Sequence, residues 1–300
     1  MNPLWRLVDR AGLAPVLRRA YFTLRAAPRG WRYRASAGGV DVEFRTSTWY
    51  EFKRASRLHG ERRVVEAFLS DLSDGEVVWD VGANVGMYAC FAAKALASGT
   101  VVGFEPVPVN RDRLEENLRA NAPQSRWETS PYTLSDADEP ATLAFGHDRS
   151  KRTEPGAGHH YLTDDGDEAG WLAVDCRRGD TLVADGLPAP DVVKVDVQGA
   201  ELKLLQGMGA VLDDVRSVYV EIHPEKTRRY GTSDEEVERF LREAGFTLSN
   251  LGAPETYRHG VYHVHAARGS VPSGDGSSDP VRSTDATPDG TPDGTPDASR

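Results

Sequence analysis

The sequence has 300 residues, 39% of them hydrophobic, and a formal net charge of −10 at pH 7. This length allows one large domain or two small ones, and no apolar run approaches the roughly 20 residues of a membrane span. The acidic balance argues against general nucleic-acid binding, which needs a basic footprint. Two cysteines, Cys90 and Cys176, are too few for a disulfide framework or a zinc site.

Residues 1–63 form a basic lead-in, with 14 Lys and Arg against 5 Asp and Glu. An amphipathic helix over Leu13–Ala26 is predicted from apolar residues at helical spacing, namely Leu13, Leu17, Tyr21 and Leu24. This helix carries Arg18, Arg19 and Arg25. These arginines belong either to the solvated face of a packed helix or to a surface that contacts anionic lipid or an anionic carrier. Residues 39–44 alternate like a strand or hairpin.

Residues 77–86, VVWDVGANVG, combine an apolar strand with a glycine-rich turn, and residues 87–97 then predict a helix. Glycines let the backbone approach a ligand or adopt positive φ, and the helix start points its amides at the site. The spacing Asp-x-Gly-x-x-x-Gly differs from the dinucleotide pattern. It resembles the first motif of S-adenosylmethionine (SAM)-dependent methyltransferases. Glu105 ends the next strand, 101–104, where an acid can bind ribose hydroxyls.

The resemblance implies SAM as cofactor. The candidate cofactor-binding residues are Asp80, Gly82, Asn84, Gly86 and Glu105, with Asp136 as an adenine contact. An NAD-type oxidoreductase on a similar sheet, or a plain turn between a strand and a helix, remains an alternative interpretation of the same residues.

Residues 64–269 are predicted to form a catalytic domain in which strands and helices alternate. Strands are predicted at 77–81, 101–104, 127–134, 141–145, 171–175, 191–195, 215–222, 246–251 and 261–265, and helices at 63–72, 87–97, 110–121, 200–208 and 233–244. Ser233 and Glu236 predict a capping box for the last helix. This alternation predicts an α/β fold with a doubly wound, mainly parallel sheet. Residues 146–170 are polar and predict a long loop or lid; its adjacent His159 and His160 lack metal-site spacing.

Residues 191–201, DVVKVDVQGAE, resemble the Lys-x-Asp-x-Glu-Gly-x-Glu segment of the FkbM family of methyltransferases, and 218–224, VYVEIHP, resemble its next strand end. The resemblance covers about residues 40–265. It implies the Rossmann-like class I methyltransferase fold and O-methyl transfer, often to hydroxyls of sugars, glycolipids or polyketide-like products. Gln198 stands where the family usually has Glu, which leaves the role of this position open.

Methyl transfer to a hydroxyl requires a positioned acceptor oxygen and removal of its proton by a base or through a cation. Asp196, Glu221 and His223 end neighbouring predicted strands, so we expect them at one edge of the sheet as the catalytic centre. Lys194 would hold a carboxylate or the acceptor. Either His223 is the general base, or Asp196 and Glu221 help hold a divalent cation; the sparse carboxylates favour the metal-free version.

Each of these residues also has a structural explanation. Asp196 can cap the helix that starts near Gly199, Glu221 can pair with Lys194, and His223 can be a wall residue. A third hypothesis for the whole chain is therefore a non-enzymatic, SAM-liganded module that docks to a membrane or carrier. Scattered positions of the three candidate catalytic residues would favour it.

Residues 270–300 repeat the motif TPDG and contain almost nothing apolar, which predicts a disordered acidic tail. The N-terminus shows no clean apolar segment between its arginines, so we expect no secretory signal. We expect a cytoplasmic protein that acts on a small molecule or glycan, with peripheral contact at the inner membrane face as the role left open for the basic lead-in.

Overall fold

The computed structural model describes residues 14–145, 154–156, 160–163, 171–252 and 260–269. Contacts group the chain into two units, Met1–Ser270 and Val271–Arg300. The predicted acidic tail, 270–300, and most of the predicted loop, 146–170, lie outside the described residues.

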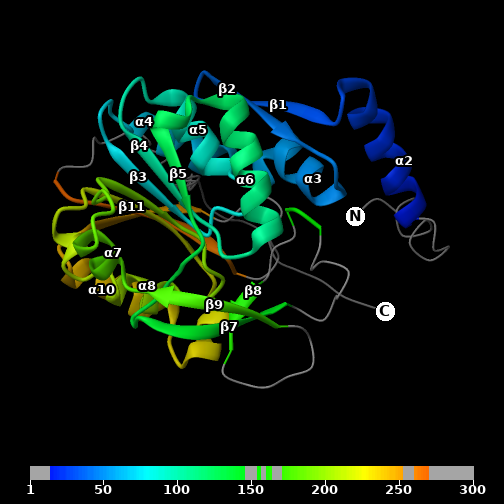
Figure 1. The fold of residues 1–300 in the computed structure, drawn as a ribbon. Helices are drawn as coiled ribbons and strands as arrows, with labels where there is room; N and C mark the ends of the chain where they lie inside the picture. The colour runs from blue at the N-terminus through cyan, green and yellow to red at the C-terminus, as the bar shows by residue number, and fades with distance from the viewer. Residues whose placement is uncertain (1–13, 146–153, 157–159, 164–170, 253–259, 270–300) are drawn as a thin grey trace, which may run out of the picture. The chain divides into compact units, whose positions relative to one another are not determined.

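A sheet of seven strands forms the centre of the first unit (Figure 1). In spatial order the strands are β12 (Thr247–Gly252), β13 (Tyr262–Ala267), β11 (Ser217–Ile222), β10 (Val192–Val195), β3 (Val77–Val81), β4 (Thr100–Phe104) and β5 (Trp127–Ser130). The five strands from β11 to β5 are parallel, and β13 is antiparallel to both of its neighbours. The predicted mainly parallel sheet is therefore confirmed.

Helices cover both faces of this sheet (Figure 1). One face carries α4 (Arg62–Asp71), α5 (Met87–Ala95) and α6 (Pro108–Asn121), and the other carries α7 (Gly179–Ala184), α8 (Glu201–Gln206) and α10 (Asp234–Glu243). Alternate strand residues serve the two cores: Val78 belongs to the first and Trp79 to the second, as the two-residue period of a strand requires. The Ser233–Glu236 capping box is confirmed.

Six short helical segments complete the connections. They are η1 (Ala27–Arg29), η2 (Leu58–Gly60), η3 (Gln124–Arg126), η5 (Val211–Asp213), α9 (Pro224–Thr227) and η6 (Arg228–Tyr230). Among the residues that the structure describes, no helix combines the length and apolar character needed to cross a membrane.

The basic lead-in packs against the helices of the central sheet. It comprises α2 (Ala14–Ala26), the antiparallel hairpin β1 (Arg32–Ala37) and β2 (Val40–Arg45), and α3 (Trp49–Arg57). The predicted amphipathic helix and hairpin are confirmed. Helix α3 was not predicted, although its capping box, Thr48 with Glu51, is a readable start signal. Phe44 of the hairpin lies 6.2 Å from Phe91 of α5, ring centre to ring centre, so the lead-in shares the core of the domain.

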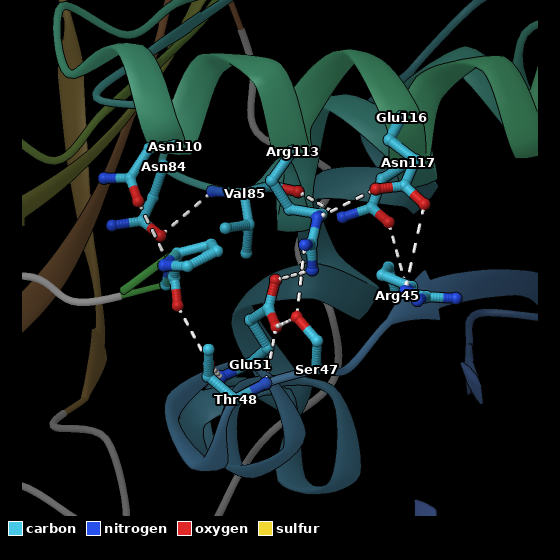
Figure 2. Close-up of polar contacts among 12 residues, drawn as sticks. Arg45, Ser47, Thr48, Glu51, Asn84, Val85, Asn110, Arg113, Glu116 and Asn117 are labelled. Atoms are coloured by element: carbon cyan, nitrogen blue, oxygen red, sulfur yellow. Dashed lines mark hydrogen bonds and ion pairs between the residues drawn. The ribbon is translucent and has the colours of Figure 1, made fainter. Parts of the chain in front are cut away.

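Polar contacts from α6 also fix the lead-in (Figure 2). Arg113 pairs with the buried Glu51 of α3. Asn117 accepts a hydrogen bond from the backbone N–H of Arg45 at 2.8 Å and donates one to the carbonyl of Val85 at 2.8 Å. One helix therefore holds both the lead-in and the glycine-rich turn after β3.

One strand prediction was wrong. The predicted strand 127–134 is two strands, because β5 ends at Ser130 before Pro131, and β6 (Thr133–Leu134) pairs with another sheet. Proline has no N–H for a ladder, which favours such a break. The second sheet has the order β6-β9-β7-β8, where β7 is Glu139–Phe145, β8 is His160–Leu162 and β9 is Trp171–Arg177. It lies beside the carboxyl ends of the central strands and supplies one wall of the pocket described next.

Candidate functional site

A pocket opens where β3, β4 and β10 end. Counting the part open to solvent, it measures about 710 Å³. Gly82, Glu105 and Asp196 follow these three strands directly and all line it. Carboxyl ends of parallel strands meet at one edge of a sheet, so the predicted convergence is present.

The turn after β3 accepts only glycine at its first position. Gly82 has φ of +82°, and a Cβ there would lie 2.0 Å from the carbonyl oxygen of Asp196. Gly86 has φ of +89°, and its Cβ would lie 2.5 Å from Cδ1 of Leu114. Non-glycine residues are disfavoured at such angles. These glycines therefore let the ends of β3 and β10 close together and let α6 pack against the start of α5.

Glu105 is buried and lines the pocket. Its Oε2 accepts the backbone N–H of Asn84 and its Oε1 that of Val107, both at 2.9 Å. Burial raises the pKa of Glu105 to about 7, against the opposing effect of these hydrogen bonds. Asn84 also lines the pocket, with φ of +52°, and accepts the N–H of Val85 at 2.9 Å on its side chain.

Asp80 and Asp136 are predicted cofactor residues that do not line this pocket. Asp80 is buried, and its Oδ2 accepts the N–H of Ala89 at 2.8 Å near the start of α5; burial raises its pKa to about 6. Asp136 accepts a hydrogen bond from Ser135 at 3.0 Å and lies 3.9 Å from Lys203. Asp80 supports the turn from behind, and the adenine contact of Asp136 stays a prediction.

Gln198 connects the predicted catalytic residues. Lys226 can only donate hydrogen bonds, so the oxygen of Gln198 faces it. The amide nitrogen then donates to Oδ1 of Asp196 at 2.7 Å and to Nε2 of His223 at 3.1 Å. His223 must therefore carry its proton on Nδ1, which lies 2.9 Å from Oε1 of the buried Glu201. A glutamate at 198 would have no N–H for either partner, so the amide is what this network requires.

Only part of this network faces the pocket. Asp196 and Gln198 line it, whereas the side chains of His223 and Glu221 are each 1% exposed and lie behind them. Nε2 of His223 is 3.9 Å from Asp196 and 3.9 Å from Glu221. Burial raises the pKa of Asp196, but Lys194 and other neighbouring positive groups outweigh this and hold it below its ordinary value. Asp196 is therefore the ionised acid that an acceptor would meet.

Lys194 supports carboxylates and does not reach the acceptor space. Its side chain is buried, donates to the carbonyl of Val195 at 2.9 Å and lies 4.9 Å from the ring centre of Tyr88. Its charge favours the ionised forms of Asp80, Asp196 and Glu221. Burial and Asp196 nevertheless raise the pKa of Glu221 well above its ordinary value.

The sequence interpretation missed several residues of the site. Glu201 belongs to the quoted FkbM-like segment, so its position was available as a signal. Arg54 of the unpredicted α3 lines the pocket. His160 was expected in a solvated loop; the structure corrects this, because His160 starts β8 and lines the pocket. His159 lies outside the described residues. Both cysteines are free and buried.

Comparison with known proteins adds the family. The Methyltransferase FkbM domain matches residues 80–248. Hexuronic acid methyltransferase AglP of Haloferax volcanii is 33% identical over 215 residues, covering 70% of this chain and 80% of that protein. The 31-O-demethyl-FK506 methyltransferase FkbM of Streptomyces tacrolimicus is 32% identical over 206 residues, covering 59% and 75%.

Among solved structures, methyltransferase FkbM from Methylobacillus flagellatus superposes with a TM-score of 0.45 at 15% identity, covering 67% of this chain and 46% of that one. The central sheet has the strand order of the Rossmann-like class I methyltransferase fold, with the antiparallel strand β13 inserted between β11 and β12. The family match spans more than half of the chain and includes the glycine turn, Glu105, Asp196 and Glu221. The chain therefore belongs to the FkbM family of methyltransferases.

Proposed function

We propose that the protein transfers a methyl group from SAM to an oxygen of a sugar-derived or other small acceptor. One observation carries this proposal: the glycine turn and Glu105 share a single pocket with the ionised Asp196. This is an arrangement for binding a cofactor at one end and an acceptor at the other. Family membership favours methyl transfer over the oxidoreductase alternative, and the convergence of the candidate residues favours an enzyme over a docking module.

The residues present fit SAM. The Gly82 position leaves no space for a side chain, so backbone can approach a ligand there, and Glu105 offers buried carboxylate oxygens for ribose hydroxyls. Asn84 lines the same end of the pocket, while Asp80 and Gly86 keep the turn in place. When bound, SAM supplies an electrophilic methyl group on a sulfonium. The chain contributes by holding the acceptor oxygen in line with it.

Asp196 and His223 provide a route for the acceptor proton. Asp196 accepts the hydrogen bond of the acceptor hydroxyl, and the proton passes from its carboxylate to Nε2 of His223 once the two groups, 3.9 Å apart in this structure, close to hydrogen-bond distance. The Gln198 amide donates hydrogen bonds to both groups, so its side chain must rotate away before the proton can pass between them. Glu201 then stabilises the charged imidazole through Nδ1. The route is metal-free; a cation held by Asp196, Glu221 and His223 is the alternative, since these three groups lie close enough to share one.

Acidic sugars are the acceptor class that the site favours. Arg54 lines the pocket near Asp196, and Lys226 donates to Gln198 beside it. Cationic side chains of this kind recognise carboxylates. The relative AglP is named as a hexuronic acid methyltransferase, which supports the same class for this chain.

The test is incubation of the full chain with methyl-labelled SAM and either free uronic acids, neutral sugars or a cell extract, followed by identification of the labelled product. We expect label on an acidic sugar, with loss of most turnover in Asp196→Asn. Mild alkali distinguishes a methylated carboxylate from a methylated hydroxyl, because a methyl ester hydrolyses and a methyl ether does not. Label found only on neutral sugars would contradict the acceptor class, and no transfer to any acceptor would contradict the function.

A further inference from the structure

A second polar cluster lies beneath the catalytic residues and takes no part in the proton route. It consists of Glu61 at the start of α4, Glu221 of β11 and His263 of β13. Glu221 and His263 are direct partners in the antiparallel ladder. The three side chains are at most 3% exposed. The cluster is therefore built by the fold from segments distant in sequence and is closed to solvent.

Glu61 accepts a hydrogen bond from the hydroxyl of Tyr88 at 2.8 Å, but the polar atoms of Glu221 and His263 lack such partners. Neither oxygen of Glu221 and neither ring nitrogen of His263 makes a hydrogen bond with the described residues. A buried polar group left in this way costs about 1–3 kcal/mol, and more if it is charged. Four such atoms on two adjacent side chains are unusual in a protein core, where nearly all polar atoms are satisfied. We therefore expect these four atoms to bind a group that is not among the described protein residues.

The charges around the cluster point to a cation. Four buried or partly buried carboxyl groups share the influence of one fully buried ammonium, that of Lys194; they are Glu61, Asp80, Asp196 and Glu221. Arg54 and Lys226 also act on Asp196. Burial and the charge of Asp196 raise the pKa of Glu221, because an uncompensated buried carboxylate is strongly unfavourable, and a bound cation would let Glu221 ionise.

The distances fit metal ligation better than hydrogen bonding. Nε2 of His263 lies 3.4 Å from Oε2 of Glu61, at the long limit for a hydrogen bond, and 3.9 Å from Oε2 of Glu221, beyond that limit. Ligand atoms about 2.0–2.2 Å from one tetrahedral ion lie roughly 3.3–3.5 Å apart. The first distance matches this spacing, and a contraction of about 0.5 Å brings in Glu221.

We propose that Glu61, Glu221 and His263 bind one divalent cation, either the borderline ion Zn²⁺ or the harder ion Mn²⁺. Two carboxylates with one imidazole suit such ions better than Mg²⁺ or Ca²⁺, which prefer oxygen alone. The role is structural. Glu221 turns Oε1 toward His223 and Oε2 toward His263, so the ion fixes the carboxylate that forms the floor of the catalytic network. This site shares Glu221 with the catalytic cation considered for Asp196, Glu221 and His223, but its other two ligands are different.

The test measures metal in the full chain without reference to activity. The protein is stripped with chelator, incubated with Zn²⁺ or Mn²⁺, desalted and analysed by elemental mass spectrometry, with calorimetric titration of the same samples. We expect about one tightly bound ion per chain and a rise in melting temperature on reloading. Glu61→Gln and His263→Gln should weaken binding at least about 100-fold, since even outer-shell partners contribute about 10–100-fold.

Glu51→Gln is the matched control, because Glu51 is equally buried but pairs with Arg113 away from this cluster. It should retain the ion. Circular dichroism shows whether each variant is folded. No tight binding of either ion by the wild type would overturn the proposal and leave Lys194 as the balancing cation. Binding that survives in Glu61→Gln and His263→Gln but is lost in Asp196→Asn would also overturn it, because the ion would then belong to the catalytic group.

Discussion

Replacing Glu105 by Gln tests the cofactor site most directly. Both oxygens of Glu105 already accept backbone N–H groups, one from Asn84 and one from Val107. Glutamine keeps the size of the side chain but has one acceptor oxygen and no charge. The variant therefore removes the charge-assisted bond proposed for the cofactor ribose and leaves one backbone N–H without its acceptor.

The size of both effects follows from these contacts. Loss of a hydrogen bond to a charged group weakens SAM binding by about 1–3 kcal/mol, or roughly 5- to 150-fold in Kd. The orphaned N–H lowers the free energy of unfolding by about 1–3 kcal/mol. Affinity and stability should both fall, but only the affinity loss depends on the cofactor.

The dependence on pH adds a second signature. Burial raises the pKa of Glu105 from 4.5 to about 7 in the folded state, so the native protein binds the proton more tightly than the unfolded chain. This group therefore stabilises the fold less as pH rises from about 4.5 to 7. Ribose hydroxyls prefer the ionised form, so wild-type affinity for SAM should increase from pH 6 to pH 8. Glu105→Gln should remove this increase.

The assay is calorimetric titration with SAM at several pH values, with thermal unfolding of the same samples. Asp71→Asn is the control, because Asp71 pairs with Arg216 and does not line the pocket. It should lower stability without a change in affinity. Wild-type affinity in Glu105→Gln, or an unchanged pH dependence of binding, would refute the assignment of Glu105 to the cofactor.

Three further predictions follow from the geometry. Gly82→Ala should abolish SAM binding and destabilise the fold, because the added Cβ would lie 2.0 Å from a backbone oxygen. Gly39→Ala is the control for φ strain alone, since Gly39 has φ of +79° and open space around it. Equal effects of the two substitutions in calorimetry and thermal unfolding would exclude the clash. Glu201→Gln should lower kcat about 10-fold or more, because the charged imidazole of His223 loses its partner. An unchanged kcat would remove Glu201 and His223 from the route. The groove between α2 and α3 should bind anionic vesicles at low salt in a flotation assay, and high salt should abolish this binding. The groove is lined by Leu17, Tyr21, Trp49, Phe52, Lys53, Ser56 and Arg57, and Lys53→Gln should reduce the binding. Absence of binding at every salt concentration would leave packing as the only role of the lead-in.

Short-range patterns in the sequence determined the central sheet and the cofactor end of the site. The apolar strand before Gly82, the glycine spacing and the acid one βαβ unit later are local features, and each sits at the predicted strand end. Parallel strands end at a common edge, so the meeting of Asp196, Glu221 and His223 followed from the order of the elements. The resemblance to the FkbM family rested on the same local segments.

Tertiary structure decided which of these residues face the ligand. Asp196 reaches the pocket, while His223 and Glu221 lie one layer deeper. No sequence pattern shows which side chains cover a strand end. The functions of Gln198 and Glu61 depend on partners far away in sequence, such as Lys226 and His263. The second sheet, with the order β6-β9-β7-β8, likewise pairs β9 with β6 and β7, which are not its neighbours in sequence. Contacts between distant segments carry no local periodicity, so only the folded chain shows them.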